Sequence, residues 1–370
     1  MSRSRLRFRL AVTFATLAVF PLLEVGLRWG GFDYPPSDGP LSIWNPAEDR
    51  AMRFGRGMFT TAPRQLWVPR PGSKDVWGDG ERINAGGYRG PYRPPGGHPG
   101  VYRVLVLGES CTFGYGVKSS ETFPSRLEAL LADRGRNVEV LNAGVIGYTV
   151  RQGLERYRAM GRAYRPDVVV EAFGEVNEHY VTGQPPDVVR IEQPLEPGNA
   201  WTEGVTFVRE NLRTAHLFAN LVDGLSAERS LERSLQFRKL SDDHETNLHM
   251  GEVDCKADRR VSPGDFETAL LELGNEVRAD GARYVMLSLP RRRSTEADAP
   301  VLRLYTQVVE ELARRENIAL ADGYHDFRAA EERGVAESDL YRDNWHLSQA
   351  GHDEIARTLY RAIGPWIDPR

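Results

Sequence analysis

From residue 101 onward, short apolar runs alternate with stretches of helical spacing, and this alternation most limits the folds open to the chain. The almost entirely apolar runs, which predict strands, are 103–107, 138–141, 168–173, 284–289 and 318–320. The stretches that predict helices are 122–133, 151–160, 265–280, 301–315 and 348–363. Strands that are apolar on both sides are typical of a parallel sheet covered by helices on both faces. We therefore expect a three-layer α/β domain.

The predicted organisation has three parts. Residues 1–28 are a separate hydrophobic segment, residues 29–100 an extended lead and linker, and residues 101–366 the α/β domain with an insertion at about 181–260. The lead is rich in Gly, Pro, Trp and Arg and shows no sustained helical period. We expect it to pack on the domain, because a free tether rarely carries so many aromatic residues. These aromatic residues are Trp67, Trp77, Tyr88 and Tyr92.

The first segment has the pattern of an export signal. Arginines at positions 3, 5, 7 and 9 precede an uncharged stretch from Leu10 to Leu23. This stretch suits a signal-peptide core or, if it runs on to Leu27, a short membrane span. Arginines on the amino side orient that end toward the cytoplasm, so the rest of the chain is expected to be extracytoplasmic. An uncleaved signal anchor is favoured, and a removed signal peptide or a buried amphipathic helix are the alternatives.

Composition and charge exclude several classes of protein. Apolar residues make up 41% and charged residues 27%, which excludes a disordered chain or a multi-spanning membrane protein. The net charge of −4 gives no reason to expect nucleic acid as a partner. Two cysteines cannot form a disulfide framework or a four-cysteine zinc site. We expect Cys111 to be a buried small apolar residue, and one bridge with Cys255 stays open outside the cytosol.

A serine follows the first predicted strand, where a parallel sheet carries its reactive groups. The sequence Gly108-Glu109-Ser110 allows a tight turn that exposes Ser110 at the carboxyl edge. A serine at this place is either a nucleophile or the N-cap of the following helix.

An acid and a histidine near the end of the chain supply the partners that a nucleophilic serine needs. Asp343 and His346 are three residues apart, so the carboxylate can reach the imidazole and hold its tautomer. His346 would then accept the proton of Ser110. The pattern D-x-x-H is weak evidence alone and stronger in combination with the Gly-x-Ser turn.

Two further loops lie at predicted strand ends. Residues 142–149 contain glycines, and residues 174–178 contain Asn177. A backbone N–H and a side-chain amide there would stabilise the negative charge that develops on oxygen in acyl transfer. The alternative is that both are ordinary turns, in which Gly and Asn are common.

These motifs resemble those of the SGNH/GDSL-type serine esterase family. Gly108-Glu109-Ser110 resembles the nucleophile block, in which Asp is usual where Glu109 stands, and Asp343–His346 resembles the final block. Asn142–Thr149 resembles the second block, which implies that Gly147 is an oxyanion donor. The resemblance implies a flavodoxin-like SGNH hydrolase fold, a Ser-His-Asp triad, and no metal or organic cofactor. Glu24 and Arg28 after the hydrophobic segment look like those of membrane-anchored bacterial members.

The third family block differs in this chain. The family has Gly-x-Asn-Asp, whereas Gly174 to Asn177 contains one extra residue. Either the loop bulges and Asn177 is the remaining oxyanion donor, or strict register places Val176 there and this donor is missing. We expect the bulge.

The resemblance implies hydrolysis of a carboxylic ester whose acyl group is carried by a glycan, a lipid or a small molecule. The first alternative is an acyltransferase that modifies an envelope polysaccharide through the same seryl ester. The second is a non-catalytic module that binds a glycan or a protein through a decayed site. The sequence leaves the acyl and alcohol portions of the substrate and the oligomeric state open.

Three basic features outside these motifs have simple alternatives. His352 could join Asp343 at a metal, but a lone helical histidine is expected at the surface. His179 could line the pocket, and a solvated loop position is favoured. The Arg291-Arg292-Arg293 run could clamp an anionic group of the substrate, although a solvated loop is again favoured.

Overall fold

The computed structural model describes residues 18–32, 58–74, 80–97, 99–133, 135, 137–174, 177–179, 186–192, 212–215, 217–218, 259–298 and 301–367. Contacts between Cα atoms divide the chain into one unit of residues 1–60 and 196–235 and another of residues 61–195 and 236–370. Most of the insertion predicted at 181–260, and Cys255 with it, lies outside the described residues.

The larger unit contains a five-stranded, fully parallel sheet with the strand order β4-β3-β5-β6-β7. Its strands are β3 (Val101–Gly108), β4 (Asn137–Asn142), β5 (Val168–Ala172), β6 (Arg283–Ser288) and β7 (Ala319–Asp322). All five strands were predicted from the sequence. The chain starts in β3, moves to the neighbouring β4 and then crosses to β5, which is a flavodoxin-like order. The switch point therefore lies between β3 and β5, where ligands of such sheets bind.

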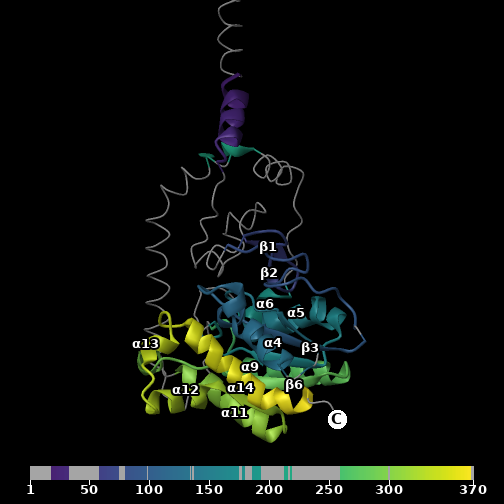
Figure 1. The fold of residues 1–370 in the computed structure, drawn as a ribbon, viewed down its shortest axis with the longest axis vertical. Coiled ribbons are helices and arrows are strands. Elements are labelled where there is room, and N and C mark those ends of the chain that lie inside the picture. The colour runs from purple at the N-terminus through teal and green to yellow at the C-terminus, as the bar shows by residue number, and fades with distance from the viewer. Residues whose placement is uncertain are drawn as a thin grey trace, which may run out of the picture. The chain divides into compact units, whose positions relative to one another are not determined.

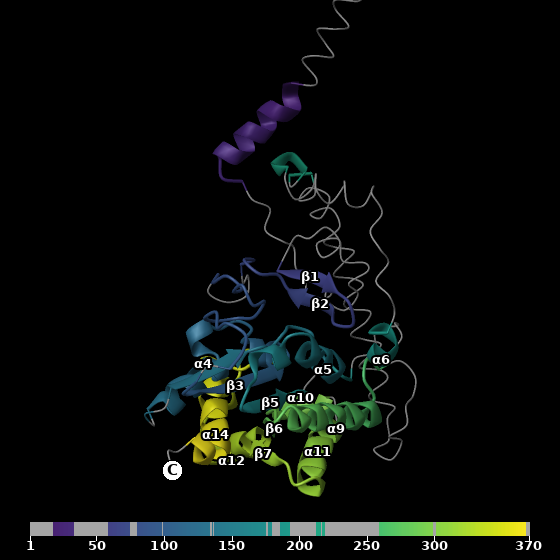
Figure 2. The same ribbon diagram turned by 90° about the vertical axis from the view of Figure 1, so that its right-hand side faces the viewer.

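Helices cover both faces of the sheet (Figure 2). One face carries α4 (Phe123–Ala132), α12 (Gly323–Glu332) and α14 (Gln349–Ile367), and α4 and α14 lie side by side (Figure 1). The other face carries α5 (Val150–Ala159), α9 (Pro263–Ala279) and α11 (Val301–Arg315). Both faces of β3 are buried, with Val104 and Leu105 each at 0% exposure. Double burial explains why the strand sequences are apolar without alternation.

Capping residues in the sequence begin two of these helices. The Thr122 side chain accepts a hydrogen bond from the Ser125 N–H, and Ser262 does the same for Asp265. Each cap is followed within two residues by proline, which suits the first helical turn. The sequence did not predict the shorter elements. They are α3 (Ser110–Phe113), α6 (Asp187–Arg190), α10 (Arg293–Asp298), α13 (Glu337–Leu340), two 3₁₀ turns, and the two-stranded sheet of β1 (Phe59–Ala62) and β2 (Leu66–Pro69). The ten-residue helix α12, which begins directly after β7, was not predicted either.

The lead packs onto the larger unit through some of its aromatic residues. Trp67 and Tyr88 are 0% and 1% exposed, so the prediction is confirmed for these two residues. Tyr92 is 50% exposed, so the prediction is wrong there, and Trp77 lies outside the described residues.

In the smaller unit, residues 18–29 form a helix. Its Glu24 carboxylate accepts hydrogen bonds from the backbone N–H groups of Arg213 and Thr214, at 2.9 and 2.8 Å. Val19, Phe20, Leu22 and Val25 of this helix are more than half exposed. In the described part of the chain, no helix has the length and apolar character needed to cross a bilayer. The first half of the predicted anchor, residues 1–17, lies outside that part.

Candidate active site

The nucleophile turn begins where β3 ends. Glu109 is the N-cap of α3 and Ser110 is its first residue, so Ser110 does not cap the helix. A Cβ atom at Gly108 would lie 2.0 Å from the Thr112 Oγ1 atom and 2.7 Å from the Ala172 carbonyl oxygen. Only glycine therefore fits at position 108, where the chain turns sharply between β5 and its own helix.

The structure brings Ser110, His346 and Asp343 together although they are far apart in the sequence. The Ser110 Oγ atom lies 3.1 Å from His346 Nε2. On the other side of the ring, His346 Nδ1 lies 2.9 Å from Asp343 Oδ2. Because a carboxylate can only accept hydrogen bonds, the ring proton sits on Nδ1 and is donated to Asp343, which leaves Nε2 to accept a hydrogen bond from the Ser110 hydroxyl. This is the order of contacts that activates a serine.

Asp343 is held in its ionised form. Partial burial opposes ionisation, but the hydrogen bond from His346 and the backbone N–H groups of Trp345 and His346 outweigh it. Together they lower the pKa of Asp343 to about 2. Both N–H groups donate to Oδ1 at 2.8 Å. The carboxylate is therefore charged and oriented throughout the neutral range.

Neighbouring side chains confine the His346 imidazole and its loop. The Tyr115 ring stacks on the imidazole, with 4.2 Å between centroids and 28° between planes. Burial and then the charge of Asp343 raise the pKa of Tyr115, so the phenol stays neutral. The buried Cys111 thiol donates to the Trp345 carbonyl at 3.4 Å. The predicted burial of Cys111 is confirmed.

The loop after β4 packs against the nucleophile turn. The Val145 N–H donates to the Gly108 carbonyl at 3.0 Å, and the Asn142 side-chain amide donates to the Phe113 carbonyl at 3.3 Å. Gly147 follows in the same loop with a φ of +76°, and it is buried. Gly147 therefore lies two residues from a direct contact with the segment that carries Ser110.

The loop after β5 places Asn177 against the same segment. Asn177 is 3% exposed, and its Nδ2 atom donates to a carboxylate oxygen of Glu109. His179 is 2% exposed, so the expectation that it is solvated is wrong. Its carbonyl accepts from Arg259 at 2.8 Å, and its ring lies 6.5 Å from that of Trp345. His179 is therefore packed against the segments of Arg259 and Trp345.

Two buried carboxyl groups lie on β5 and on the loop that follows it. Glu171 and Glu178 are 0% and 1% exposed. Burial, followed by the charge of Glu109, raises the pKa of Glu178 to about 8, although Val150 N–H donates to the Glu178 carboxyl at 3.0 Å. Burial also raises the pKa of Glu171 well above its usual value. Glu178 is therefore protonated at neutral pH in the folded protein.

We expect Glu178→Gln to stabilise the protein at alkaline pH. The folded pKa of about 8 lies above the ordinary value of 4.5, so the wild type loses stability as pH rises through this window. Glutamine can accept the same Val150 N–H without a proton to lose. Its advantage in the free energy of unfolding should grow to on the order of a few kcal/mol by pH 9 and vanish near pH 4. Thermal denaturation of both proteins between pH 4 and pH 9 measures this difference in stability, with the exposed Glu332→Gln as the control. A difference between variant and wild type that does not change with pH would contradict the raised pKa of Glu178.

Two further expectations about basic residues are wrong, one for His352 and one for Arg291, whereas Arg293 of the same run is exposed as expected. His352 is 1% exposed, because its Nδ1 atom accepts the Phe123 N–H at 3.2 Å between α14 and α4. Burial lowers the pKa of His352 to about 3, so it is a neutral structural acceptor. Arg291 is 3% exposed and donates to the Gly174 carbonyl and the Thr306 hydroxyl, so it ties down the loop after β5.

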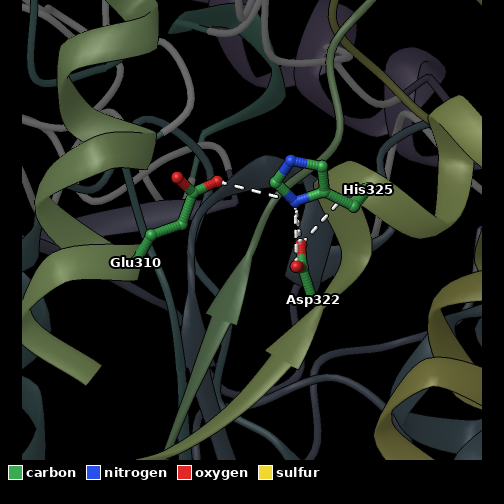
Figure 3. Close-up of side chains that lie close together, drawn as sticks. All are labelled: Glu310, Asp322 and His325. Carbon is green, nitrogen blue, oxygen red and sulfur yellow. Dashed lines mark hydrogen bonds and ion pairs between the residues drawn. The ribbon is translucent and has the colours of Figure 1, made fainter. Parts of the chain in front are cut away.

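One cluster has the residue types of a metal site (Figure 3). Glu310, Asp322 and His325 offer ligand atoms that lie within 4.8 Å of one another. Other contacts account for the cluster. Arg303 pairs with Glu310 at 3.1 Å, the Ser288 hydroxyl donates to Asp322 at 2.9 Å, and Asp322 caps α12. The cluster is therefore satisfied as a charge network at the end of β7, the strand at one edge of the sheet.

Arg89 of the lead supports the site, and the sequence analysis missed it. Its guanidinium group donates to the carbonyls of Phe113, Gly114 and Val117, at 3.0, 2.6 and 2.7 Å. These carbonyls follow Ser110 at the end of α3, where helical carbonyls lack partners. Arginines abound in the lead, and no spacing in the sequence distinguishes this one.

One curated protein matches part of the chain. An arylesterase of Vibrio mimicus is 33% identical over 87 residues, which make up 24% of this chain. The match spans only 42% of that arylesterase, less than half of its length.

Two solved structures show similarity at low identity. LAE5, an alpha/beta hydrolase enzyme from the metagenome of Lake Arreo in Spain, is 17% identical with a TM-score of 0.45, over 73% of this chain and 97% of that one. Axe2, an acetylxylan esterase from Geobacillus stearothermophilus, is 17% identical with a TM-score of 0.44, over 71% and 94%.

The family is shown by a profile match rather than by any single relative. The profile of the GDSL-like lipase/acylhydrolase family matches residues 106–354, about two thirds of the chain. The matched range runs from the end of β3 through the Asp343–His346 loop into α14, so it includes the nucleophile turn and both partners of Ser110. The chain therefore belongs to the GDSL-like lipase/acylhydrolase family, which comprises SGNH/GDSL-type carboxylic-ester hydrolases.

Proposed function

We propose that the protein hydrolyses a carboxylic ester through a covalent intermediate on Ser110. The observation that carries this proposal is the continuous chain of contacts from Ser110 Oγ to His346 Nε2, at 3.1 Å, and from His346 Nδ1 to Asp343, at 2.9 Å. A binding module with a decayed site has no need of this alignment. This alignment therefore supports catalysis over the non-catalytic alternative.

The reaction proceeds in two halves. Ser110 Oγ attacks the ester carbonyl carbon while His346 Nε2 takes the hydroxyl proton, and Asp343 stabilises the resulting imidazolium. His346 then protonates the departing alcohol, which leaves an acyl group on Ser110. Water attacks this seryl ester, His346 again takes the proton, and the carboxylic acid leaves as Ser110 recovers its hydrogen.

The negative charge on the carbonyl oxygen requires donors, and three lie on the loops that meet here. We assign them to the backbone N–H groups of Ser110 and Gly147 and to the side-chain amide of Asn177. The Ser110 N–H lies in the first turn of α3, where backbone donors lack helical partners. The Asn177 amide carries two hydrogens. Glu109 accepts one, which orients the amide, and the other remains for substrate.

Asn177→Ala should lower kcat by about 100-fold, because one oxyanion donor is lost and the effect falls on the transition state. KM for a small ester should change little. Steady-state kinetics of the full chain measure this split. Asn275→Ala on α9 is the matched control, since Asn275 is exposed and its side-chain oxygen accepts from Arg278 of the same helix. A kcat equal to that of the wild type would remove Asn177 from the oxyanion hole.

The substrate is proposed to be an ester with a small acyl group, carried by a sugar, a lipid or a small molecule. The named relatives supply the support, since one is called an arylesterase and another an acetylxylan esterase. The test uses p-nitrophenyl acetate and butyrate, followed by mass spectrometry of Ser110 after a fluorophosphonate label. Turnover with a labelled Ser110 supports the proposal, and a folded protein with neither signal overturns it. Product analysis with an added sugar acceptor distinguishes hydrolysis from acyl transfer.

We also propose that the N-terminal segment anchors the protein in a membrane, with the catalytic unit on the extracytoplasmic side. The four early arginines and the uncharged stretch from Leu10 to Leu23 support this orientation. The exposed apolar side chains of residues 18–29 are consistent with a lipid environment. Retention in membranes after carbonate extraction, together with protease access from the periplasmic side only, would be expected; release by carbonate would contradict anchoring.

A further inference from the structure

The peptide unit between Ile146 and Gly147 has a constrained orientation. The Tyr148 N–H donates to the Val145 carbonyl at 3.2 Å, which closes a turn with Ile146 and Gly147 at its centre. Gly147 has a φ of +76° and Ile146 does not have a positive φ, which is the pattern of a type II turn. The central peptide of such a turn is rotated relative to that of a type I turn. A glycine at position 147 therefore selects which way this peptide faces.

The carbonyl end of this peptide is held by a residue of the lead. The Trp67 indole Nε1–H donates to the Ile146 carbonyl oxygen at 3.1 Å, and Trp67 is 0% exposed. The indole packs edge-on against Tyr148, with 5.7 Å between the ring centroids, and the Tyr148 hydroxyl donates to the Trp67 carbonyl. Because C=O and N–H of a trans peptide point in opposite directions, the Gly147 N–H faces away from Trp67.

The next carbonyl is held by a buried cation. Arg260 Nη1 donates to the Gly147 carbonyl at 2.7 Å, and Arg260 is 1% exposed. Asp187 fixes Arg260 through an ion pair of 2.8 Å in which both side chains are fully buried. The Arg260 guanidinium lies 5.6 Å from the centre of the Trp67 ring. Trp67 and Arg260 therefore form one buried pair that binds two consecutive carbonyl groups.

The Gly147 N–H itself is left available. Among the residues that the structure describes, none accepts a hydrogen bond from it. Its loop is attached to the nucleophile segment two residues earlier, through Val145 and the Gly108 carbonyl. Hydrogen bonds on the flanking carbonyls also polarise the peptides, which strengthens an N–H donor.

We infer that Trp67 and Arg260 are positioning residues that aim the Gly147 N–H at the oxyanion, so that a residue of the lead takes part in setting the turnover rate. The inference rests on the proposed function. It assigns the Trp67 indole N–H a task that burial of an aromatic ring alone does not require, since a bicyclic ring without an N–H would fill the core equally well.

The test removes the indole N–H in two variants. Trp67→Phe keeps an aromatic ring, and site-specific Trp67→benzothienylalanine keeps the full bicyclic shape with sulfur in place of N–H, so the second variant folds even if the first does not. We expect kcat for p-nitrophenyl acetate to fall about tenfold with KM unchanged, because the donor is misdirected rather than removed. The inhibition constant of a trifluoromethyl ketone, whose oxygen becomes an oxyanion when Ser110 adds, should rise by the same factor. The control is Trp366→Phe, at the end of α14 beneath Arg283.

The outcomes separate the inference from the function on which it rests. An active wild type with unchanged kcat in both Trp67 variants overturns the inference and leaves the esterase intact. A fall in kcat without a rise in the inhibition constant also overturns it, since the oxyanion would then be unaffected. A folded but inactive and unlabelled wild type overturns the proposed function itself.

Discussion

Ser110→Ala is expected to reduce kcat for p-nitrophenyl acetate by about 10⁵-fold, to the level left by binding and the oxyanion donors alone. The reason is that the hydroxyl, which lies 3.1 Å from His346 Nε2, is the only group in the alignment that can form the acyl intermediate. Fluorophosphonate should no longer add mass to the protein. Active-site titration before kinetics fixes the concentration of functional enzyme, so that a trace of wild type is not mistaken for residual activity.

The matched control is Ser125→Ala in the first turn of α4, where the hydroxyl contacts Thr122 and has no part in the proposed chemistry. It should retain wild-type turnover. Ser110→Cys is a useful second variant because it keeps a nucleophile of similar size. If Ser110→Ala retained more than about a tenth of the activity in a folded protein, another nucleophile would have to be sought.

Asp343→Asn should reduce kcat by about 10⁴-fold while leaving the fold intact. The carboxylate accepts from His346 Nδ1 and so leaves Nε2 free to receive the serine proton. An asparagine amide can donate to Nδ1 instead, which places the ring proton on Nε2 and turns a base into a donor. Because the pKa of Asp343 is lowered to about 2, its ionisation should not limit activity anywhere above about pH 3.

NMR of the imidazole nitrogens in the wild type and in Asp343→Asn would report the tautomer directly, and kinetics would report its effect. Exposed Asp339→Asn on the neighbouring α13 is the control for charge alone. Turnover of Asp343→Asn within tenfold of the wild type would mean that His346 is oriented by other contacts. The Tyr115 ring, stacked at 4.2 Å, would then be the first group to test.

The sheet and its large helices could be predicted because burial on both faces leaves a direct mark on the sequence. Val104 to Leu107 must be apolar at every position, and the caps at Thr122 and Ser262 mark helix starts within a residue or two. The short elements left no comparable mark. Helix α3 has four residues and follows from the turn at Gly108, and α12 has the weak signal of a helix that follows a strand without a loop.

The contacts among Ser110, His346 and Asp343 could be predicted because these residue types and their order are unusual, whereas the residues that support them could not. Ser110 and the Asp343–His346 pair follow from motif and position. Arg89 and Arg260 are ordinary arginines in a chain that contains many, and only the path of the chain shows which carbonyls they reach. Burial of His352 could not be predicted either, because it depends on a hydrogen bond from the Phe123 N–H, a residue far away in the sequence. This hydrogen bond satisfies Nδ1 of the neutral imidazole in the core.

The contacts of the lead show that the residues which support the site extend beyond the range of the family match. The family match begins at residue 106, but Trp67 and Arg89 lie upstream of it and reach the loop after β4 and the end of α3. A transplant of residues 106–354 into another protein would carry the nucleophile, the base and the acid, yet lack Trp67 and Arg89 as well as most of β3 and α14. Recombination that separated the lead from the α/β domain would break the same contacts. We therefore expect the two segments to be inherited together. A unit that is to keep these contacts after transfer must therefore start ahead of Trp67, even though the family match starts only at residue 106.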